Sequence, residues 1–301
     1  MGFTRINFNS DEICSSYLCG RKKIMSMGDS SGNIKILNLK EGFGLYKILK
    51  IHDLGVTKIS TVDSKLLSCS LDSKLKIWDL SKWCLINSFF EHQGSINDLD
   101  VSEKTIITAS EDGDLRIWDI RIKSSTGKIS HGSNLTNCSF LNDKNLILSH
   151  GLTNFVYLWD LRMNQNILAK SKILKKSNYS ILSSCVSKFS NFIFILDSQN
   201  KVYRLTGRDK KISSPCNFFS ENNIRKEALH KSILKLNLDD RGNFILNGDS
   251  QGKSYIRSQK NGKILSQFKD HFAPVKEVII NSVLKIFFSY SIDGSFIFRT
   301  F

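Results

Sequence analysis

The sequence Lys76-Ile77-Trp78-Asp79-Leu80 returns in altered form as Arg116-Ile117-Trp118-Asp119-Ile120 and again as Tyr157-Leu158-Trp159-Asp160-Leu161. The first two tryptophans lie 40 residues apart, and the second and third lie 41 apart. A fixed period near this length is the signature of a repeat architecture, in which each unit buries its apolar face only against its neighbours. The period therefore predicts the whole architecture.

Weaker copies of the unit, in which another residue replaces the tryptophan, extend the period in both directions. The replacing residues are Leu37, Leu205, Arg257 and Arg299. Leu37 precedes Trp78 by 41 residues, and the other three follow Trp159 at successive intervals of 46, 52 and 42 residues. Seven units therefore fill the 301 residues, and we expect a single domain over residues 1–301.

The composition favours a folded protein of a reducing, intracellular compartment. Hydrophobic residues make up 41% of the chain, which is enough for a continuous core, and no apolar stretch approaches the roughly 18 residues that span a bilayer. The N-terminus lacks the apolar segment of a signal peptide. The seven cysteines form no Cys-x-x-Cys pair, which argues against a disulfide framework and against a zinc site. We therefore expect a nuclear or cytoplasmic protein.

The chain is strongly basic, with 43 lysines and arginines, 28 aspartates and glutamates, and a net charge of +15. A charge of this size can attract nucleic acid, phospholipid or acidic protein surfaces. Lysines spread over polar faces are equally typical of a general compositional bias. The sequence leaves open whether the charge is a binding footprint.

Each unit reads as several short β-strands. Residues 65–70 and 74–78 alternate between apolar and polar side chains, and the polar turn 71–73 separates them. Residues 105–110 and 115–118 repeat this hairpin in the next unit. No segment of convincing length shows a helical period, so the sequence predicts an all-β fold.

Histidines return at a nearly constant position. His52 precedes Asp72 by 20 residues, and His92 precedes Asp112 by 20. Three further histidines hold the comparable position in later units: His131, His230 and His271. A catalytic or metal site needs its groups to converge once, whereas these residues are distributed around the repeat. The periodicity therefore predicts a structural role, and we expect no catalytic residue, no metal ligand and no cofactor.

The combination of an early His, a Ser or Thr on the second strand, an Asp in the turn and a closing Trp-Asp resembles the WD-repeat family. The resemblance implies a hydrogen-bonded tetrad inside a blade of a β-propeller. One tetrad would contain His52, Ser68 (or Ser70), Asp72 and Trp78, and the other His92, Thr108, Asp112 and Trp118. Seven units imply a seven-bladed ring. We expect the N-terminal strand, residues 3–8, to complete the last blade.

The resemblance implies a non-enzymatic scaffold, because propellers of this family present loops to other macromolecules. The sequence contains no Gly-x-Ser-x-Gly elbow, no phosphate-binding glycine loop and no His-Glu-x-x-His. We expect a propeller that is monomeric on its own and binds protein partners in a multisubunit complex, with RNA associated indirectly and no small-molecule substrate. Direct binding of RNA or of an anionic membrane surface is a further alternative.

Two features bear on which complex this is. Units three and four both end in Trp-Asp-x-Arg, with Arg121 and Arg162, and tandem copies resemble those of substrate receptors of cullin–RING ubiquitin ligases. A simpler interpretation is that both arginines face solvent. We also expect a long loop over residues 207–229, between the fifth and sixth blades. This order of blades resembles the WD-repeat subunit of the spliceosomal small nuclear ribonucleoprotein that carries the largest splicing factor, so splicing is the leading hypothesis.

The residues that follow the periodic histidines are expected to line one mouth of the ring. They are Asp53, Leu54, Gln93, Asn134, Tyr179 and Phe272. Aromatic residues at such a rim are typical of the residues that dominate protein–protein binding energy. We therefore expect partner binding at this mouth.

Overall fold

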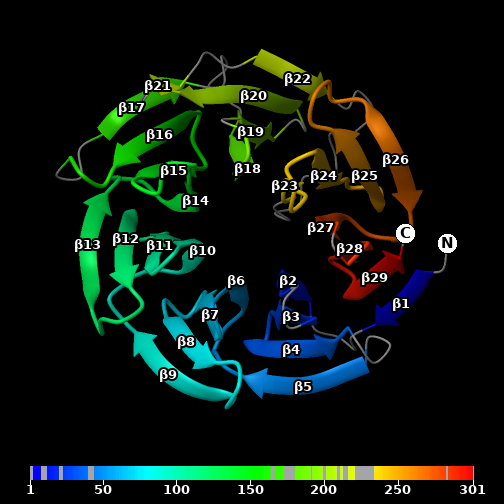
Figure 1. Ribbon diagram of the computed structural model, residues 1–301, viewed down its shortest axis with the longest axis horizontal. Coiled ribbons are helices and arrows are strands. Elements are labelled where there is room, and N and C mark those ends of the chain that lie inside the picture. Colours follow the sequence, from blue (N-terminus) through cyan, green and yellow to red (C-terminus); the bar gives the residue numbers. More distant parts are fainter. Residues whose placement is uncertain are drawn as a thin grey trace.

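The computed structural model is a closed ring of seven β-sheets, arranged like blades around a central axis (Figure 1). It describes residues 3–7, 12–19, 23–39, 44–163, 167–172, 180–190, 192–198, 201–208, 211–212, 216–220, 234–282 and 284–300. These residues contain no helix, and so none that could cross a membrane. The predicted all-β, seven-bladed fold is confirmed.

The strands follow one another around the ring in chain order. Blade 1 contains β2 (Ile13–Cys19), β3 (Ile24–Asp29), β4 (Asn33–Asn38) and β5 (Gly44–Lys50); blade 2 contains β6 (Val56–Val62), β7 (Lys65–Ser70), β8 (Leu75–Asp79) and β9 (Cys84–Phe89). Blade 3 contains β10 (Ile96–Ser102), β11 (Thr105–Ser110), β12 (Asp114–Asp119) and β13 (Ser125–Ser130); blade 4 contains β14 (Leu135–Phe140), β15 (Leu146–Gly151), β16 (Phe155–Asp160) and β17 (Ile167–Lys172).

Blade 5 contains β18 (Ile181–Val186), β19 (Phe192–Asp197), β20 (Lys201–Arg208), β21 (Lys211–Ile212) and β22 (Cys216–Ser220). Blade 6 contains β23 (Asn237–Leu238), β24 (Phe244–Gly248), β25 (Lys253–Ser258) and β26 (Ile264–Lys269); blade 7 contains β27 (Val275–Asn281), β28 (Ile286–Ser291), β29 (Ser295–Thr300) and β1 (Phe3–Asn7). The segment 207–229 is therefore partly strand, because β22 pairs with β20 and supplies an outer strand of blade 5. Residues 209–210, 213–215 and 221–229 lie outside the described part.

The ring closes by pairing its two ends. β1 runs antiparallel to β29, with Thr4 opposite Phe298 and Asn7 opposite Ser295. Figure 1 shows these two strands, from opposite ends of the chain, side by side in one blade. The expectation that the N-terminal strand completes the last blade is confirmed.

The described residues form seven hydrophobic core clusters, and each lies between two neighbouring blades. The cluster between blades 2 and 3, for example, contains Leu67, Ile77, Phe89 and Trp118. The cluster around Met25, Leu37 and Phe288 joins blade 7 to blade 1 across the closure. Because each blade contributes to two clusters, no blade has a complete core of its own.

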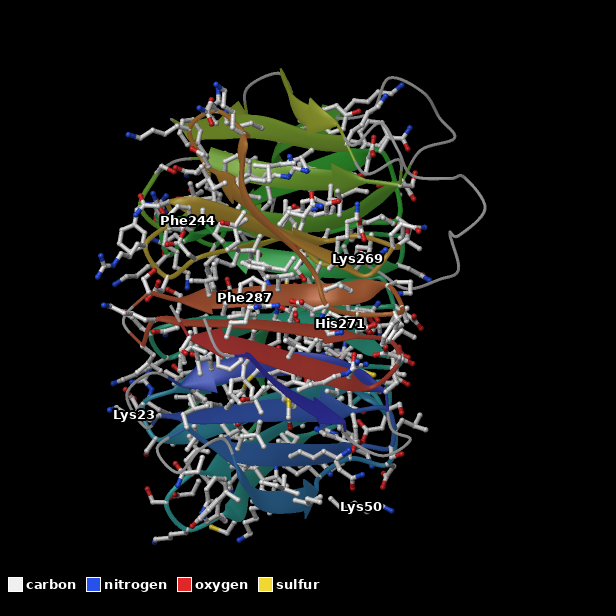
Figure 2. The ribbon with its side chains drawn as sticks, turned by 90° about the vertical axis from the view of Figure 1, so that its right-hand side faces the viewer. Lys23, Lys50, Phe244, Lys269, His271 and Phe287 are labelled. Carbon is white, nitrogen blue, oxygen red and sulfur yellow. The ribbon has the colours of Figure 1, made fainter. Side chains whose placement is uncertain are left out.

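Two faces of the ring carry different turns. One face carries the turns that join one blade to the next and the turns that join the second strand of a blade to the third. We call it the histidine face, because His52, His92 and His271 lie there. The turns between the first and second strands, and between the third and fourth, form the opposite face. Figure 2 shows Lys23 at the edge of the opposite face and His271 inside the molecule, toward the histidine face.

The innermost strands of six blades share a β-bulge close to their first residue. The register shifts between Val56 and Lys58, between Ile96 and Asp98, and at the same level in blades 1, 4, 5 and 7. A bulge re-aims the side chains beside it. The residues after the bulge therefore form one layer around the axis: Ser15, Lys58, Asp98, Asn137, Ser183 and Glu277.

Candidate functional site

Blade 3 contains a complete polar cluster. The Trp118 indole N–H donates to Thr108 Oγ1 at 2.9 Å, and Thr108 lies 2.8 Å from His92 Nε2. Because the Asp112 carboxylate can only accept, His92 Nδ1 donates to it at 2.7 Å. Burial lowers the pKa of His92, which favours the neutral ring, so Nε2 accepts from Thr108, and Thr108 in turn accepts from Trp118. One chain of hydrogen bonds therefore joins β11, β12 and the turn between them to the loop that precedes β10.

Blade 2 contains the same residues but one bond fewer. His52 lies 2.8 Å from Ser68 Oγ and 2.9 Å from Asp72 Oδ2. Burial alone would raise the pKa of Asp72, but the hydrogen bond from His52 and the charge on its ring lower that pKa to about 2. The buried indole N–H of Trp78 has no hydrogen-bond partner among the described residues. The predicted tetrad is therefore a triad here, and Trp78 contributes packing alone.

Two further blades keep the histidine with different partners. His131 bonds through Nδ1 to Ser133 at 3.1 Å and packs edge-on against Tyr157, while Trp159 donates to Ser149 at 2.7 Å. His271 lies 2.6 Å from Ser295 and 2.8 Å from Ser289 instead of bonding to the turn aspartate. His230 lies outside the described residues.

Blades 1, 5 and 6 use a second kind of cluster that the sequence analysis missed. In each, a buried aspartate ends the second strand and contacts the residue six positions later on the third. Asp29 pairs with Lys35 at 3.2 Å, and Asp197 and Asp249 accept from Tyr203 and Tyr255 at 3.1 and 2.9 Å. The spacing Asp-x5-Lys/Tyr at the second-strand end would have identified these clusters, but a pattern based on tryptophan overlooks them.

The predicted rim residues lie on the histidine face. Asp53, Leu54, Gln93, Asn134 and Phe272 border it, and Tyr179 lies outside the described residues. The backbone N–H groups of Asp53 and Gln93 donate to the cluster aspartates Asp72 and Asp112 at 3.1 and 3.0 Å. The polar clusters therefore hold the rim turns in place.

An exposed apolar group lies around Leu54. The backbone N–H of Leu71, in the neighbouring turn, donates to the carbonyl of Gly55, and the Lys74 amine lies over the Phe90 ring at 5.8 Å. Lys74 also pairs with Asp53 at 2.6 Å. Leu54 and Phe90 expose 52% and 63% of their surfaces. We call Leu54, Leu71 and Phe90, with the ion pair among them, the rim patch; Leu71 and Phe90 were not predicted from sequence.

The two predicted arginines lie at equivalent turns on the opposite face. Arg121 donates to both carboxylate oxygens of Asp119, and Arg162 donates to both oxygens of Asp160 and to Asp143. Their side chains still expose 63% and 49% of their surfaces. The aspartates therefore fix the guanidinium planes and leave one side of each open.

The described residues show no group of three or more His, Cys, Asp or Glu side chains that could hold a metal ion. The cysteine pKa values follow burial: the pKa of Cys69 is raised to about 12 because its thiol is desolvated. Cys69 and Cys138 are both buried and free. These thiols are structural core residues.

Seven blades, repeating His-Ser/Thr-Trp clusters and exposed rim turns are the features of a WD-repeat β-propeller. The family model "WD domain, G-beta repeat" matches residues 44–79 and 83–119. Propellers of this family are generally scaffolds for protein interactions.

Among curated proteins, the chain is similar to the U5 small nuclear ribonucleoprotein 40 kDa protein of Dictyostelium discoideum, with 26% identity over 48% of this chain and 42% of that protein. It is also similar to eukaryotic translation initiation factor 3 subunit I of Caenorhabditis briggsae, with 25% identity over 77% of this chain and 72% of that protein. WD repeat and SOCS box-containing protein 1 of Homo sapiens is 28% identical over 33% of this chain and 25% of that protein. The matches to the first and third relatives span less than half of each relative's length.

Proposed function

We propose that this chain is a non-enzymatic subunit of an intracellular multiprotein assembly and that it docks a protein partner on the rim patch. The observation that carries this proposal is the group of exposed apolar side chains, Leu54, Leu71 and Phe90, on a face whose turns donate backbone hydrogen bonds to the cluster aspartates. Large exposed apolar groups with a polar surround are typical of interaction sites. A preorganised loop also loses little conformational entropy on binding.

The chemistry of the rim patch favours a mainly apolar partner surface. Lys74 and Asp53 neutralise each other, so the patch has no net charge of its own. Phe90 offers an aromatic side chain of the kind that dominates interface energy. A partner that inserts an aliphatic or aromatic side chain between Leu54 and Phe90 would bury apolar surface on both sides.

Splicing is the context that we propose first, because one similar protein is by name a subunit of the U5 small nuclear ribonucleoprotein. The alternative of translation initiation rests on the longer match to a subunit of initiation factor 3, which spans 77% of this chain. Both names describe subunits of large assemblies, which supports a scaffold role in either context.

A role as a cullin–RING substrate receptor is the third candidate, and its specific support is the pair Arg121 and Arg162. Both guanidinium groups are oriented by their own blade's aspartate and remain partly exposed. An oriented planar fork can still donate to a carboxylate or carbonyl of a partner.

Affinity purification of the tagged full chain tests the proposal. We expect Leu54→Asp with Phe90→Asp to abolish recovery of the main partner, because two carboxylates would be buried in an apolar contact. The matched control is Ile264→Asp with Leu265→Asp, which changes two similarly exposed apolar residues on the outer strand β26. Unchanged recovery with the rim variant, or equal loss with the control, would refute the docking site.

The identity of the recovered proteins separates the contexts. Spliceosomal proteins and RNA support the first, and initiation factor 3 subunits support the second. Recovery of a cullin adaptor that disappears with Arg121→Ala and Arg162→Ala would replace both with the ubiquitin-ligase role.

A further inference from the structure

A cavity of about 790 Å³ opens along the axis on the face opposite the histidines. The second halves of the innermost strands and the turns that follow them line it, including Val62 and Asp63 in blade 2 and Val101 and Glu103 in blade 3. Cavities of this size hold ligands or several side chains of a partner.

The inner end of this cavity is closed by a layer of charged side chains. Lys235, from blade 6, reaches past blade 7 and donates to the carbonyls of Cys14 and Thr57 in blades 1 and 2, at 3.3 and 3.5 Å. Lys58 pairs with Asp98 at 3.4 Å, and Glu277 lies 3.8 Å from Lys235. Two lysines and two carboxylates therefore balance one another in this layer, and its charges are used within the fold.

The walls and mouth have the opposite sign to the rest of the protein. Seven carboxylates and two lysines line the cavity, although the whole chain carries a net charge of +15. The carboxylates are Asp63, Asp98, Asp100, Glu103, Asp239, Asp240 and Glu277, and the lysines are Lys58 and Lys188. Asp98 and Glu277 belong to the inner layer, and Glu103 pairs with Lys144. The other four carboxylates have no ion pair within 4 Å in the part of the chain that the structure describes.

A further feature of the wall fits a ligand. Phe189 lies at the mouth with 72% of its surface exposed, close to Gly242 and thus beside the turn that carries Asp239 and Asp240. An exposed ring beside carboxylates suits a cationic side chain, which gains from both the ring face and the charge.

We propose that this cavity binds a lysine- or arginine-rich segment of a protein partner. The carboxylates without an ion pair are spread over blades 2, 3 and 6, and no three of the described acidic, histidine or cysteine side chains converge closely enough for a metal ion. A ligand with several separated positive charges matches this distribution of carboxylates better than a ligand with a single charge. The site is distinct from the rim patch and does not depend on the function proposed for it.

Fluorescence anisotropy of a labelled oligo-arginine peptide with the folded full chain tests the site directly. At low ionic strength the net charge of the protein repels this peptide, so binding requires a local acidic site. We expect Asp63→Asn and Asp240→Asn each to weaken binding about threefold, and the double variant about tenfold, in line with exposed ion pairs. Glu111→Gln, which removes an exposed carboxylate from the histidine face, is the matched control and should leave the affinity unchanged.

The variants are chosen so that the fold is preserved. Asp63 has a φ of 52°, a left-handed conformation that asparagine tolerates. The Asp240 carboxylate accepts a bond from the backbone N–H of Ser282, and the amide oxygen introduced by Asp240→Asn could still accept it. Lys188→Ala provides a gain that misfolding cannot imitate, because removal of a positive charge from the mouth should tighten binding.

Three results would overturn the proposal: no binding of the peptide, equal weakening by Glu111→Gln, or no gain with Lys188→Ala. Tighter binding of spermine than of the peptide would also overturn it, because a free polyamine would then fit better than a protein segment.

Discussion

The contrast between Trp118 and Trp78 gives a quantitative test of the blade clusters. Trp118→Phe removes a buried hydrogen bond to Thr108, which costs about 1 kcal/mol, and leaves a smaller ring in the core, which costs about 1–2 kcal/mol more. Trp78→Phe makes the same change in volume but removes an N–H that is buried without an acceptor among the described residues. The substitution removes this desolvation penalty, which offsets about 1 kcal/mol or more of the loss from the smaller ring. We expect losses of about 2–3 kcal/mol for Trp118→Phe and about 0–1 kcal/mol for Trp78→Phe.

Chemical denaturation followed by circular dichroism measures both free energies of unfolding. The comparison is internal, because both residues close the third strand of adjacent blades and lie opposite Ile106 and Leu66 in the same register. Equal losses would show that the Trp118 bond contributes nothing net. A larger loss at Trp78 would show that its indole finds an acceptor in solution, and the distinction between tetrad and triad would be wrong.

Three other predictions follow from the closure, the buried histidines and the aspartate clusters. Deletion of residues 1–8 removes the outer strand of blade 7, and we expect a fall in melting temperature of the whole ring rather than of one blade. His150 is fully buried on β15, with Nε2 3.1 Å from Ser184 Oγ, and burial lowers its pKa to about 4. The unfolded chain therefore takes up a proton first as the pH falls below about 6.5, and stability should decline by up to about 1.4 kcal/mol per pH unit down to pH 4. His150→Leu should reduce this slope. Tyr255→Phe should lower the free energy of unfolding by about 1–2 kcal/mol, because Asp249 would lose a buried donor. Unchanged thermal unfolding would show that the bond between Tyr255 and Asp249 does not stabilise blade 6.

Much of this fold could be predicted from the sequence because repetition multiplies a weak signal. No single unit specifies a propeller, but three Trp-Asp copies established the period, and the period located Leu37, Leu205 and the two arginines. Each of these four residues lies opposite a residue of the second strand, as Trp118 lies opposite Ile106. Leu37 and Leu205 are buried there, as expected of apolar replacements for a core ring.

The sequence could not show which side chains of a cluster reach one another. Trp78 and Trp118 are both flanked by Ile and Asp, yet only the Trp118 indole has an acceptor among the described residues, because that depends on the packing between blades. The aligned turn aspartate of blade 7 is present, but His271 bonds to Ser295 instead. The cavity could not be predicted from the sequence for another reason. Asp63, Asp100 and Asp240 come from separate repeats, and only the closure of the ring brings them to one mouth.

The division between periodic and non-periodic residues explains where binding can arise in this protein. The periodic histidines and aspartates of blades 2 and 3 satisfy one another inside the blades, so their hydrogen-bonding capacity is not available to a partner. Residues at turns are under no such constraint, and both proposed sites use them: Leu54 and Phe90 on one face, Asp63 and Asp240 on the other. Because the two groups lie on opposite faces, a variant in one should leave the other intact. We therefore expect that the two proposed sites can be occupied at the same time, one by an apolar partner and the other by a basic partner, which is the geometry that a scaffold between two proteins requires.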